Sequence, residues 1–180
     1  AVVGATGAIG KVCAELLADD VAELYLIGRR ADALESLRER LQAGARARLH
    51  TSTSMDDLPK AHLILTVTSA VHDIIHTEHL RPGAVICDVA RPRDVSAMVA
   101  AVRNDILVID GGMVYVPGPV DFHFNFGFPP GKAYACMAET IALALEGRFE
   151  DYTLGKDISR QRVEEITAIA GKHGFRLSGF

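Results

Sequence analysis

The hydrophobic pattern divides the first two thirds of the chain into short apolar runs separated by amphipathic stretches. Near-continuous apolar runs of this kind are typical of strands that are covered on both faces of a sheet. Helical spacing is plainest at 31–42, where Leu34, Leu37 and Leu41 form one apolar stripe that we expect in the core. The pattern therefore predicts an α/β fold in which six parallel strands form a doubly wound sheet. The expected strands lie at 1–3, 23–27, 47–50, 61–67, 84–88 and 105–109.

The organisation changes after Gly112. Residues 113–132 contain four of the seven prolines and show neither strand nor helix periodicity, so we expect a long loop there. Helical spacing returns at about 133–146 and 159–173, with Ser159 as an N-cap and Gly174 as a stop. We expect one domain over 1–180 with a C-terminal helical extension over 133–180. The first strand is short against the usual five or so residues, so we expect upstream residues, a substrate domain among them, to be absent.

A glycine-rich segment, GATGAIG at 4–10, joins the first strand to a helical stretch. Strand, glycine turn and helix form the setting of a dinucleotide-binding fingerprint, although ordinary turns also collect glycine. Glycine lets backbone amides approach a pyrophosphate, and the positive end of the helix dipole then faces that anion. We expect a Rossmann turn that binds a nucleotide. The residues expected to contact it are Gly4, Thr6, Gly7, Ala8, Ile9 and Gly10.

Further cofactor contacts are expected where the other strands end. Ligands of doubly wound sheets lie beyond the carboxyl ends of the strands. The residues at those ends that we expect in the cofactor site are Thr66, Val67, Thr68 and Ser69 after the fourth strand, Asp88 after the fifth and Gly111 after the sixth.

The second strand ends in Gly28, Arg29 and Arg30, with no carboxylate before Asp32. A site that prefers NAD usually places an acidic residue here to hold the ribose 2′-hydroxyl. Paired guanidiniums instead suit a 2′-phosphate, to which they offer charge-assisted hydrogen bonds. The pair favours NADPH as the cofactor. In the alternative interpretation, Arg30 simply starts a solvated helix.

Composition excludes several functional classes. The chain is 49% hydrophobic with a formal charge of −4, which gives no overall attraction to nucleic acid. Its three cysteines lack disulfide or zinc-ligand spacing and suit a reducing cytoplasm. No apolar stretch reaches the roughly 20 residues of a transmembrane segment. His72, His76 and His79 could share a helical face, but without further ligands we expect a solvated face and no metal site. The oligomeric state is not indicated.

Three C-terminal segments narrow the chemistry: GGMV at 111–114, AYACMAET at 133–140 and KHGFR at 172–176. Together with the glycine turn, they resemble the long-chain acyl-[acyl carrier protein] reductases. That family makes fatty aldehydes with NADPH, and its fold is related to the shikimate dehydrogenases. The resemblance implies a thioester of acyl carrier protein or coenzyme A as substrate, and Cys136 as the nucleophile. His173 belongs to the third segment and is interpreted as structural.

The surroundings of Cys136 give this role some independent support. It falls near the start of a predicted helix, soon after Lys132, and both a helix N-terminus and a lysine favour the nucleophilic thiolate. We therefore treat Cys136 and Lys132 as candidate catalytic residues. A free cysteine is also often a small buried hydrophobe, and we interpret Cys13 and Cys87 in that way.

Other features keep alternatives open. The segment DVARP at 88–92 departs from the glycine-rich one expected of the reductases, so the acyl channel could differ. The YTLGK segment at 152–156 matches the Tyr-x-x-x-Lys pair of short-chain dehydrogenases, but Gly155 disfavours the helix that would align it. The alternative functions are an NADP-dependent oxidoreductase resembling the shikimate or quinate dehydrogenases, and a non-catalytic module that senses NADPH.

Overall fold

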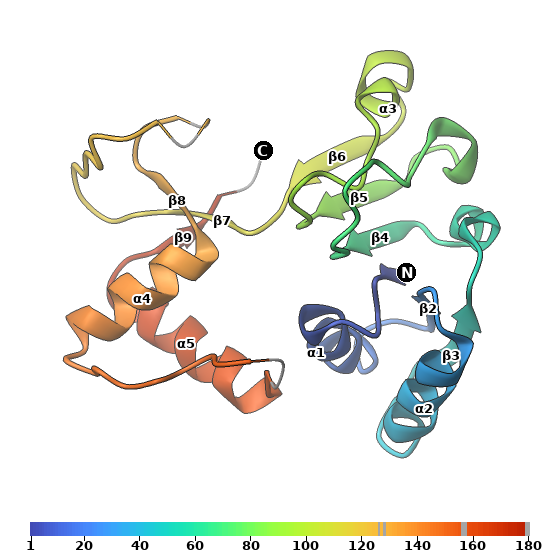
Figure 1. The fold of residues 1–180 in the computed structure, drawn as a ribbon, viewed down its shortest axis with the longest axis horizontal. Helices are drawn as coiled ribbons and strands as arrows, with labels where there is room; N and C mark the ends of the chain where they lie inside the picture. The colour runs from blue at the N-terminus through green and yellow to red at the C-terminus, as the bar shows by residue number, and fades with distance from the viewer. Residues whose placement is uncertain (126, 128, 156–157, 179–180) are drawn as a thin grey trace. The chain divides into compact units, whose positions relative to one another are not determined.

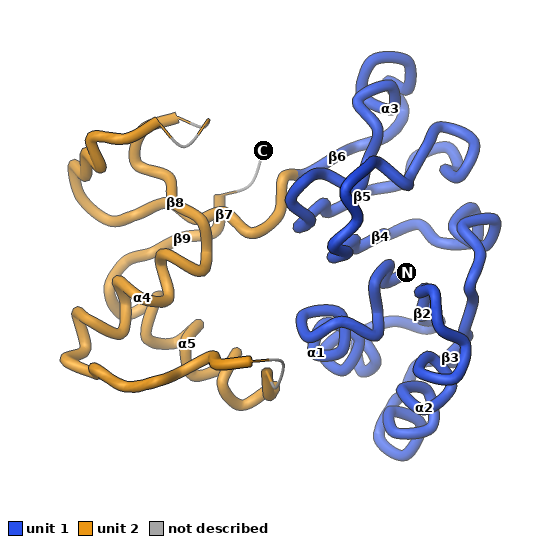
Figure 2. Tube along the Cα trace, in the orientation of Figure 1, with its two compact units in different colours: residues 1–109 blue, residues 110–180 orange. Residues whose placement is uncertain are grey.

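The computed structural model describes residues 1–125, 127, 129–155 and 158–178 (Figure 1). The chain forms two compact units, Ala1–Ile109 and Asp110–Phe180 (Figure 2). The first unit contains the predicted sheet. The second unit begins before the helical extension expected from residue 133 and has a small sheet of its own.

The six predicted strands are all present and form one parallel sheet, which confirms the α/β, doubly wound Rossmann fold. Their order is β3-β2-β1-β4-β5-β6. The strands are β1 (Val2–Val3), β2 (Glu23–Ile27), β3 (Arg48–Ser52), β4 (Leu63–Thr66), β5 (Val85–Asp88) and β6 (Leu107–Asp110).

The order of the strands reverses at β1, which pairs with both β2 and β4. Val2 is opposite Leu26 on one side and Leu65 on the other, and Val3 is opposite Ile27 and Thr66. The loops that follow β1 and β4 therefore leave the sheet next to each other. In an open α/β sheet, this reversal is where the ligand crevice forms.

Two apolar clusters cover the two faces of the sheet. Val2 and Leu26 pack with α1 (Ala8–Leu17) and α2 (Ala31–Gln42), whereas Val3 and Ile27 enter the other cluster. This alternation follows from the period of two along a strand. The predicted stripe of Leu34, Leu37 and Leu41 is buried in the first cluster, as expected.

The second face differs in detail from the prediction. The helical segments between β3 and β5 are two 3₁₀ turns, η1 (Met55–Lys60) and η2 (Thr77–His79). The helix between β5 and β6, α3 (Ala97–Val102), is short. Pro59 lies inside η1 and prevents a longer α-helix, because proline lacks the amide hydrogen that the helix needs. Leu58, Leu80 and Val99 nevertheless supply this face of the core.

Among its described residues, the second unit contains three short antiparallel strands in the order β8-β7-β9. They are β7 (Met113–Tyr115), β8 (Lys132–Tyr134) and β9 (Arg176–Leu177). The prediction of an unstructured loop over 113–132 was thus wrong at both ends, where β7 and β8 pair. Strands of two or three residues are too short to show a period of two, so the sequence pattern could not reveal them.

The helices described in this unit are α4 (Ala135–Leu145) and α5 (Arg160–Lys172). Ala138 and Ala142 of α4 form a small core with Phe175, against which Ile166 and Ile169 of α5 pack. Ser159 caps α5 as predicted, because its hydroxyl accepts the Arg162 amide at 3.2 Å. Gly174 ends α5 with a φ of 86°, also as predicted.

Glu146 connects the ends of α4 and α5. Its carboxylate accepts from Lys172 Nζ at 2.6 Å and lies 2.7 Å from His173 Nε2. The hydrogen bond from Lys172, followed by that of His173, lowers the pKa of Glu146. His173 therefore has a partner that fits the structural interpretation of this residue.

Candidate nucleotide-binding site

The glycine turn after β1 is hydrogen-bonded to β2 and packs closely on the loop after β4. The amides of Gly4 and Ala5 donate to Ile27 O of β2 at 2.9 and 3.1 Å, and Gly7 N donates to Gly4 O at 2.9 Å. Gly4 has a φ of 83°, and a Cβ there would lie 3.1 Å from Val67 O in the loop after β4. Glycine is thus required at position 4 both by backbone conformation and by close packing.

Gly10 allows α1 to pack directly on this turn. It is buried, and a Cβ at this position would lie 2.2 Å from Gly4 O and 2.9 Å from Ala5 Cα. No side chain fits at these distances. Gly10 therefore serves the close packing of helix on turn, which is the role of the third glycine in a dinucleotide-binding fingerprint.

The start of α1 is suited to an anion. Its N-cap, Gly7, is exposed and provides no side-chain cap, and the first turn has no acidic residue. Within the described part of the chain, the amides of Thr6, Ala8 and Ile9 have no hydrogen-bond acceptor. Unsatisfied amides at the positive end of a helix bind phosphate groups, so these residues fit a dinucleotide's pyrophosphate.

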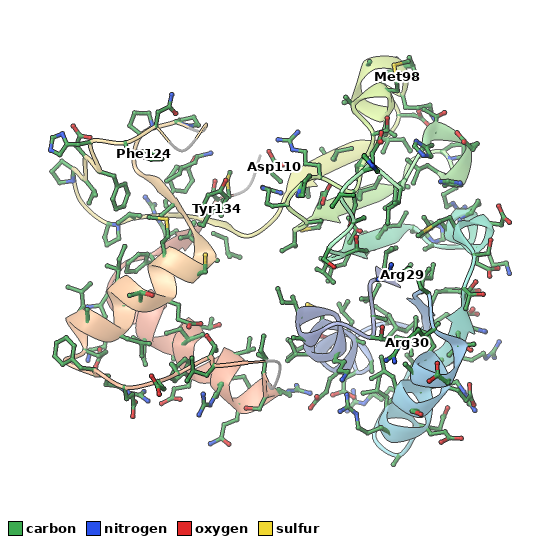
Figure 3. The ribbon with its side chains drawn as sticks, viewed as in Figure 1. Arg29, Arg30, Met98, Asp110, Phe124 and Tyr134 are labelled. Atoms are coloured by element: carbon green, nitrogen blue, oxygen red, sulfur yellow. The ribbon has the colours of Figure 1, made fainter. Side chains whose placement is uncertain are left out.

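Arg29 and Arg30 lie at the carboxyl end of β2 (Figure 3). Both side chains are exposed, and neither pairs with a carboxylate among the residues that the structure describes. A Cβ on the preceding Gly28 would lie 3.7 Å from Thr6 Oγ1, which places this segment beside the glycine turn. Two guanidiniums next to the glycine turn could hold a phosphate group.

The loop after β4 contributes less than predicted. Thr66, expected to contact the cofactor, is wholly buried, and its hydroxyl donates to Asp94. Thr66 therefore supports the loop, and its side chain is not available to a ligand. Thr68 is half-buried and donates both its amide and its hydroxyl to Asp94, whereas Ser69 is exposed. Val67 borders the turn through its carbonyl oxygen.

Asp88 also differs from its expected role. It is wholly buried at the end of β5, where its carboxylate accepts the amides of Ala90 and Val95, each at 3.0 Å. Burial raises the pKa of Asp88, against the effect of these two hydrogen bonds. We therefore assign Asp88 to holding the chain that follows β5, rather than to cofactor contact.

Gly111, Lys132 and Cys136 belong to the second unit. Cys136 is the second residue of α4 and is exposed, as the prediction of a helix N-terminus required. Lys132 is buried, and its Nζ lies 4.9 Å from the centre of the Tyr115 ring, a cation–π contact. The structure thus gives Lys132 an aromatic partner that the sequence did not indicate.

The other two cysteines are half-buried in the first unit, Cys13 on α1 and Cys87 on β5. Burial, and then the nearby Cys87, raises the pKa of Cys13, which disfavours the reactive thiolate there. This agrees with the interpretation of both residues as packing residues.

Tyr152 is a structural residue of the second unit. Its hydroxyl donates to Glu165 Oε2 at 2.7 Å and lies 2.9 Å from the Arg162 carbonyl oxygen. Burial, then the hydrogen bond to Glu165, raises the pKa of Tyr152 to about 12. A catalytic tyrosine of the short-chain dehydrogenase type needs the opposite shift. Lys156, its predicted partner, lies outside the described residues.

Replacing Tyr152 by phenylalanine should therefore affect stability alone. Loss of a hydrogen bond to a carboxylate costs about 2 kcal/mol, so we expect a lower melting temperature with unchanged nucleotide affinity and turnover. Thermal unfolding and activity assays of Tyr152→Phe measure both. A stable variant that lost turnover would reinstate the tyrosine as a catalytic group.

The predicted histidine face is not a helix face. His72 lies in a bend, whereas His76 caps η2 and donates its amide to His79 Nδ1 at 3.1 Å. The described residues contain no group of three or more His, Cys, Asp or Glu side chains that could hold a metal ion.

An apolar cavity of about 660 Å³ lies at the opposite, amino-terminal ends of the strands. Leu17, Leu24, Leu63 and Val85 are among its lining residues. Because ligands of such sheets bind at the carboxyl ends, this cavity is not the expected nucleotide site.

The fold and the glycine turn agree with a comparison of sequences. The family described as shikimate/quinate 5-dehydrogenase matches residues 1–110. The chain belongs to this family. Its first unit is thus a nucleotide-binding domain of the kind found in dehydrogenases and reductases, and this relationship indicates a nicotinamide cofactor.

Two curated relatives match nearly the whole chain. An aminotransferase, PigE, of Serratia sp. is 37% identical over 97% of this chain and 21% of its own length. A long-chain acyl-[acyl-carrier-protein] reductase of Synechococcus elongatus is 30% identical over 98% of this chain and 52% of its own length. The chain thus spans about a fifth of one relative and about half of the other.

Among solved structures, the nucleotide-binding domain of glutamyl-tRNA reductase from Thermoplasma volcanium is similar, with 21% identity and a TM-score of 0.35. The match covers 48% of this chain and 56% of that one.

None of the helices described here has both the length and the apolar character needed to cross a membrane.

Proposed function

We propose that this chain is the NADPH-binding part of a reductase that converts acyl thioesters to aldehydes through an acyl-enzyme on Cys136. The observation that carries the cofactor half is the uncapped start of α1 beside two unpaired arginines. The acyl half rests on the exposed Cys136 at the start of α4 and on the likeness to the acyl carrier protein reductase.

Different residues of the first unit would contact different parts of the cofactor. The free amides of Thr6, Ala8 and Ile9 would bind the pyrophosphate. Arg29 and Arg30 would hold the 2′-phosphate, for which the end of β2 offers cations and no carboxylate. When bound, NADPH supplies a hydride.

Replacing Arg29 and Arg30 together by alanine should lower the affinity for NADPH about 100-fold, since each charge-assisted hydrogen bond contributes roughly 1.5 kcal/mol or more. NADH lacks the 2′-phosphate, so its affinity should change little. Isothermal titration calorimetry with both nucleotides measures this difference. Arg40→Ala, an exposed arginine in the last turn of α2, is the matched control. Equal losses for both nucleotides would refute the assignment.

The thiol of Cys136 would attack the carbonyl carbon of the substrate thioester and release the carrier thiol, which takes the proton. The acyl group is then held on the enzyme as a new thioester. Reduction of that carbonyl would give a hemithioacetal anion on Cys136, and breaking its carbon–sulfur bond would release the aldehyde and leave the cysteine thiolate, which takes a proton from water. The carrier of the thioester, acyl carrier protein or coenzyme A, is the proposed partner.

Mass spectrometry of the intact protein after incubation with acyl thioesters, without NADPH, tests this function. An increase by the mass of one acyl group, located on Cys136, is the expected result. Absence of the adduct together with turnover of a hydroxy acid or ketone would favour the alternative within the family, a dehydrogenase related to the shikimate and quinate enzymes.

A further inference from the structure

We infer that Asp94 is a positioning residue that fixes the loop after β4 in the shape that the nucleotide needs. This inference rests on the proposed nucleotide site. Asp94 itself is wholly buried, so it acts on the ligand only through the loop.

The Asp94 carboxylate receives three hydrogen bonds from the end of β4 and the loop that follows. The Thr66 hydroxyl and the Thr68 amide donate to Oδ2, the latter at 3.1 Å, and the Thr68 hydroxyl donates to Oδ1 at 2.5 Å. The Thr68 hydroxyl in turn accepts the Ala70 amide at 3.1 Å. Both carboxylate oxygens are therefore used, and the loop from Thr66 to Ala70 is tied to one side chain.

This loop lies directly on the glycine turn. A Cβ at Gly4 would lie 3.1 Å from Thr68 Cγ2 and 3.2 Å from Thr68 N. Displacement of Thr68 would therefore change the surface beside Gly4, at the point where the strand order reverses and the crevice forms. Through Thr68, the buried carboxylate controls one wall of that crevice.

The main chain around Asp94 is itself firmly held. Its carbonyl oxygen accepts the amides of Ile74 and Ile75 at 2.8 and 2.9 Å, and the amide of Val95 donates to Asp88 at 3.0 Å. The carboxylate is thus presented to the loop from a separate, hydrogen-bonded segment. A restraint from such an anchor fixes the loop before any ligand binds, which reduces the entropy lost on binding.

Asparagine at this position has the same shape but the wrong chemistry. The amide nitrogen of asparagine donates hydrogen bonds and does not accept them. If it took the place of Oδ1, the Thr68 hydroxyl would lose its acceptor. If it took the place of Oδ2, the Thr66 hydroxyl and the Thr68 amide would lose theirs. We expect Asp94→Asn to weaken NADPH binding about 10-fold or more, since hydrogen bonds to charged groups are worth more than neutral ones. Thr68→Val, which removes the donated hydroxyl, should have a similar effect.

Titration calorimetry on wild type, Asp94→Asn, Thr68→Val and their double variant tests the inference. The double variant should lose little more than either single one, because both break the same contact. Thr68→Ser keeps the hydroxyl and should bind close to wild type. Far-ultraviolet circular dichroism and melting curves establish that each variant is folded at the assay temperature. If Asp94→Asn does not fold, Thr68→Val against Thr68→Ser decides the question.

Hydrogen exchange without ligand separates this inference from the proposed function. Exchange at the amides of Thr68 and Ala70 should be faster in Asp94→Asn than in wild type, while exchange at the centre of the sheet stays the same. If Asp94→Asn does not fold, Thr68→Val is measured in its place. A wild-type protein that binds neither NADPH nor NADH overturns the proposed function, whatever the exchange shows. If wild type binds, unchanged exchange or unchanged affinity in these variants overturns the positioning role.

Discussion

Cys136→Ser should form no acyl adduct and should lower aldehyde production by about a thousandfold or more, because removing a catalytic nucleophile has effects of this size or larger. Serine keeps nearly the same shape, but its hydroxyl is a far weaker nucleophile than a thiolate at neutral pH. Cys136 is exposed at the start of α4, so the exchange should not disturb a packed core. Intact-mass measurement and an aldehyde assay report the two effects separately.

The other two cysteines provide matched controls. Cys13 and Cys87 lie in the first unit and are half-buried, so Cys13→Ser and Cys87→Ser should cost some stability yet retain the adduct. NADPH affinity should remain at the wild-type value in Cys136→Ser, since the cofactor contacts proposed above lie in the first unit. Wild-type rates of aldehyde formation by Cys136→Ser would exclude the covalent route while leaving the nucleotide site intact.

The features predicted correctly from sequence are those with a local cause. Apolar runs identified the parallel strands, and the stripe of Leu34, Leu37 and Leu41 identified α2, because burial imposes a period on neighbouring residues. The glycine turn was recognisable for the same reason, since Gly4 has a left-handed backbone conformation and Gly10 meets a steric demand within the segment itself.

The features missed depend on how later segments of the chain fold back on these residues. Thr66 and Asp88 stand at strand ends, where ligands usually bind, but whether such a side chain faces a ligand or the protein depends on the loop that returns to it. Asp94 comes from that loop, and its contacts with Thr66 and Thr68 have no sequence signature. Likewise, β7 and β8 are recognisable only as a pair.

Gly10→Ala should be the most destabilising small substitution in the first unit. The added Cβ would lie 2.2 Å from Gly4 O, and neither this carbonyl oxygen nor a Cβ, whose position the main chain fixes, can rotate away. Either α1 or the turn must move by about an ångström, and overpacking of a rigid contact costs about 3 kcal/mol or more. We expect a melting temperature lower by about 10 °C and loss of nucleotide binding in the molecules that remain folded.

Gly171→Ala separates this steric effect from helix propensity. Gly171 lies in α5, is exposed, and a Cβ there would meet nothing within 4 Å. Alanine is the better helix former by about 1 kcal/mol, so the same exchange should stabilise α5 while it destabilises α1. Chemical denaturation of both variants measures the two free energies. If Gly10→Ala were as stable as wild type and still bound NADPH, the close approach of α1 to the turn would not be what shapes the anion site.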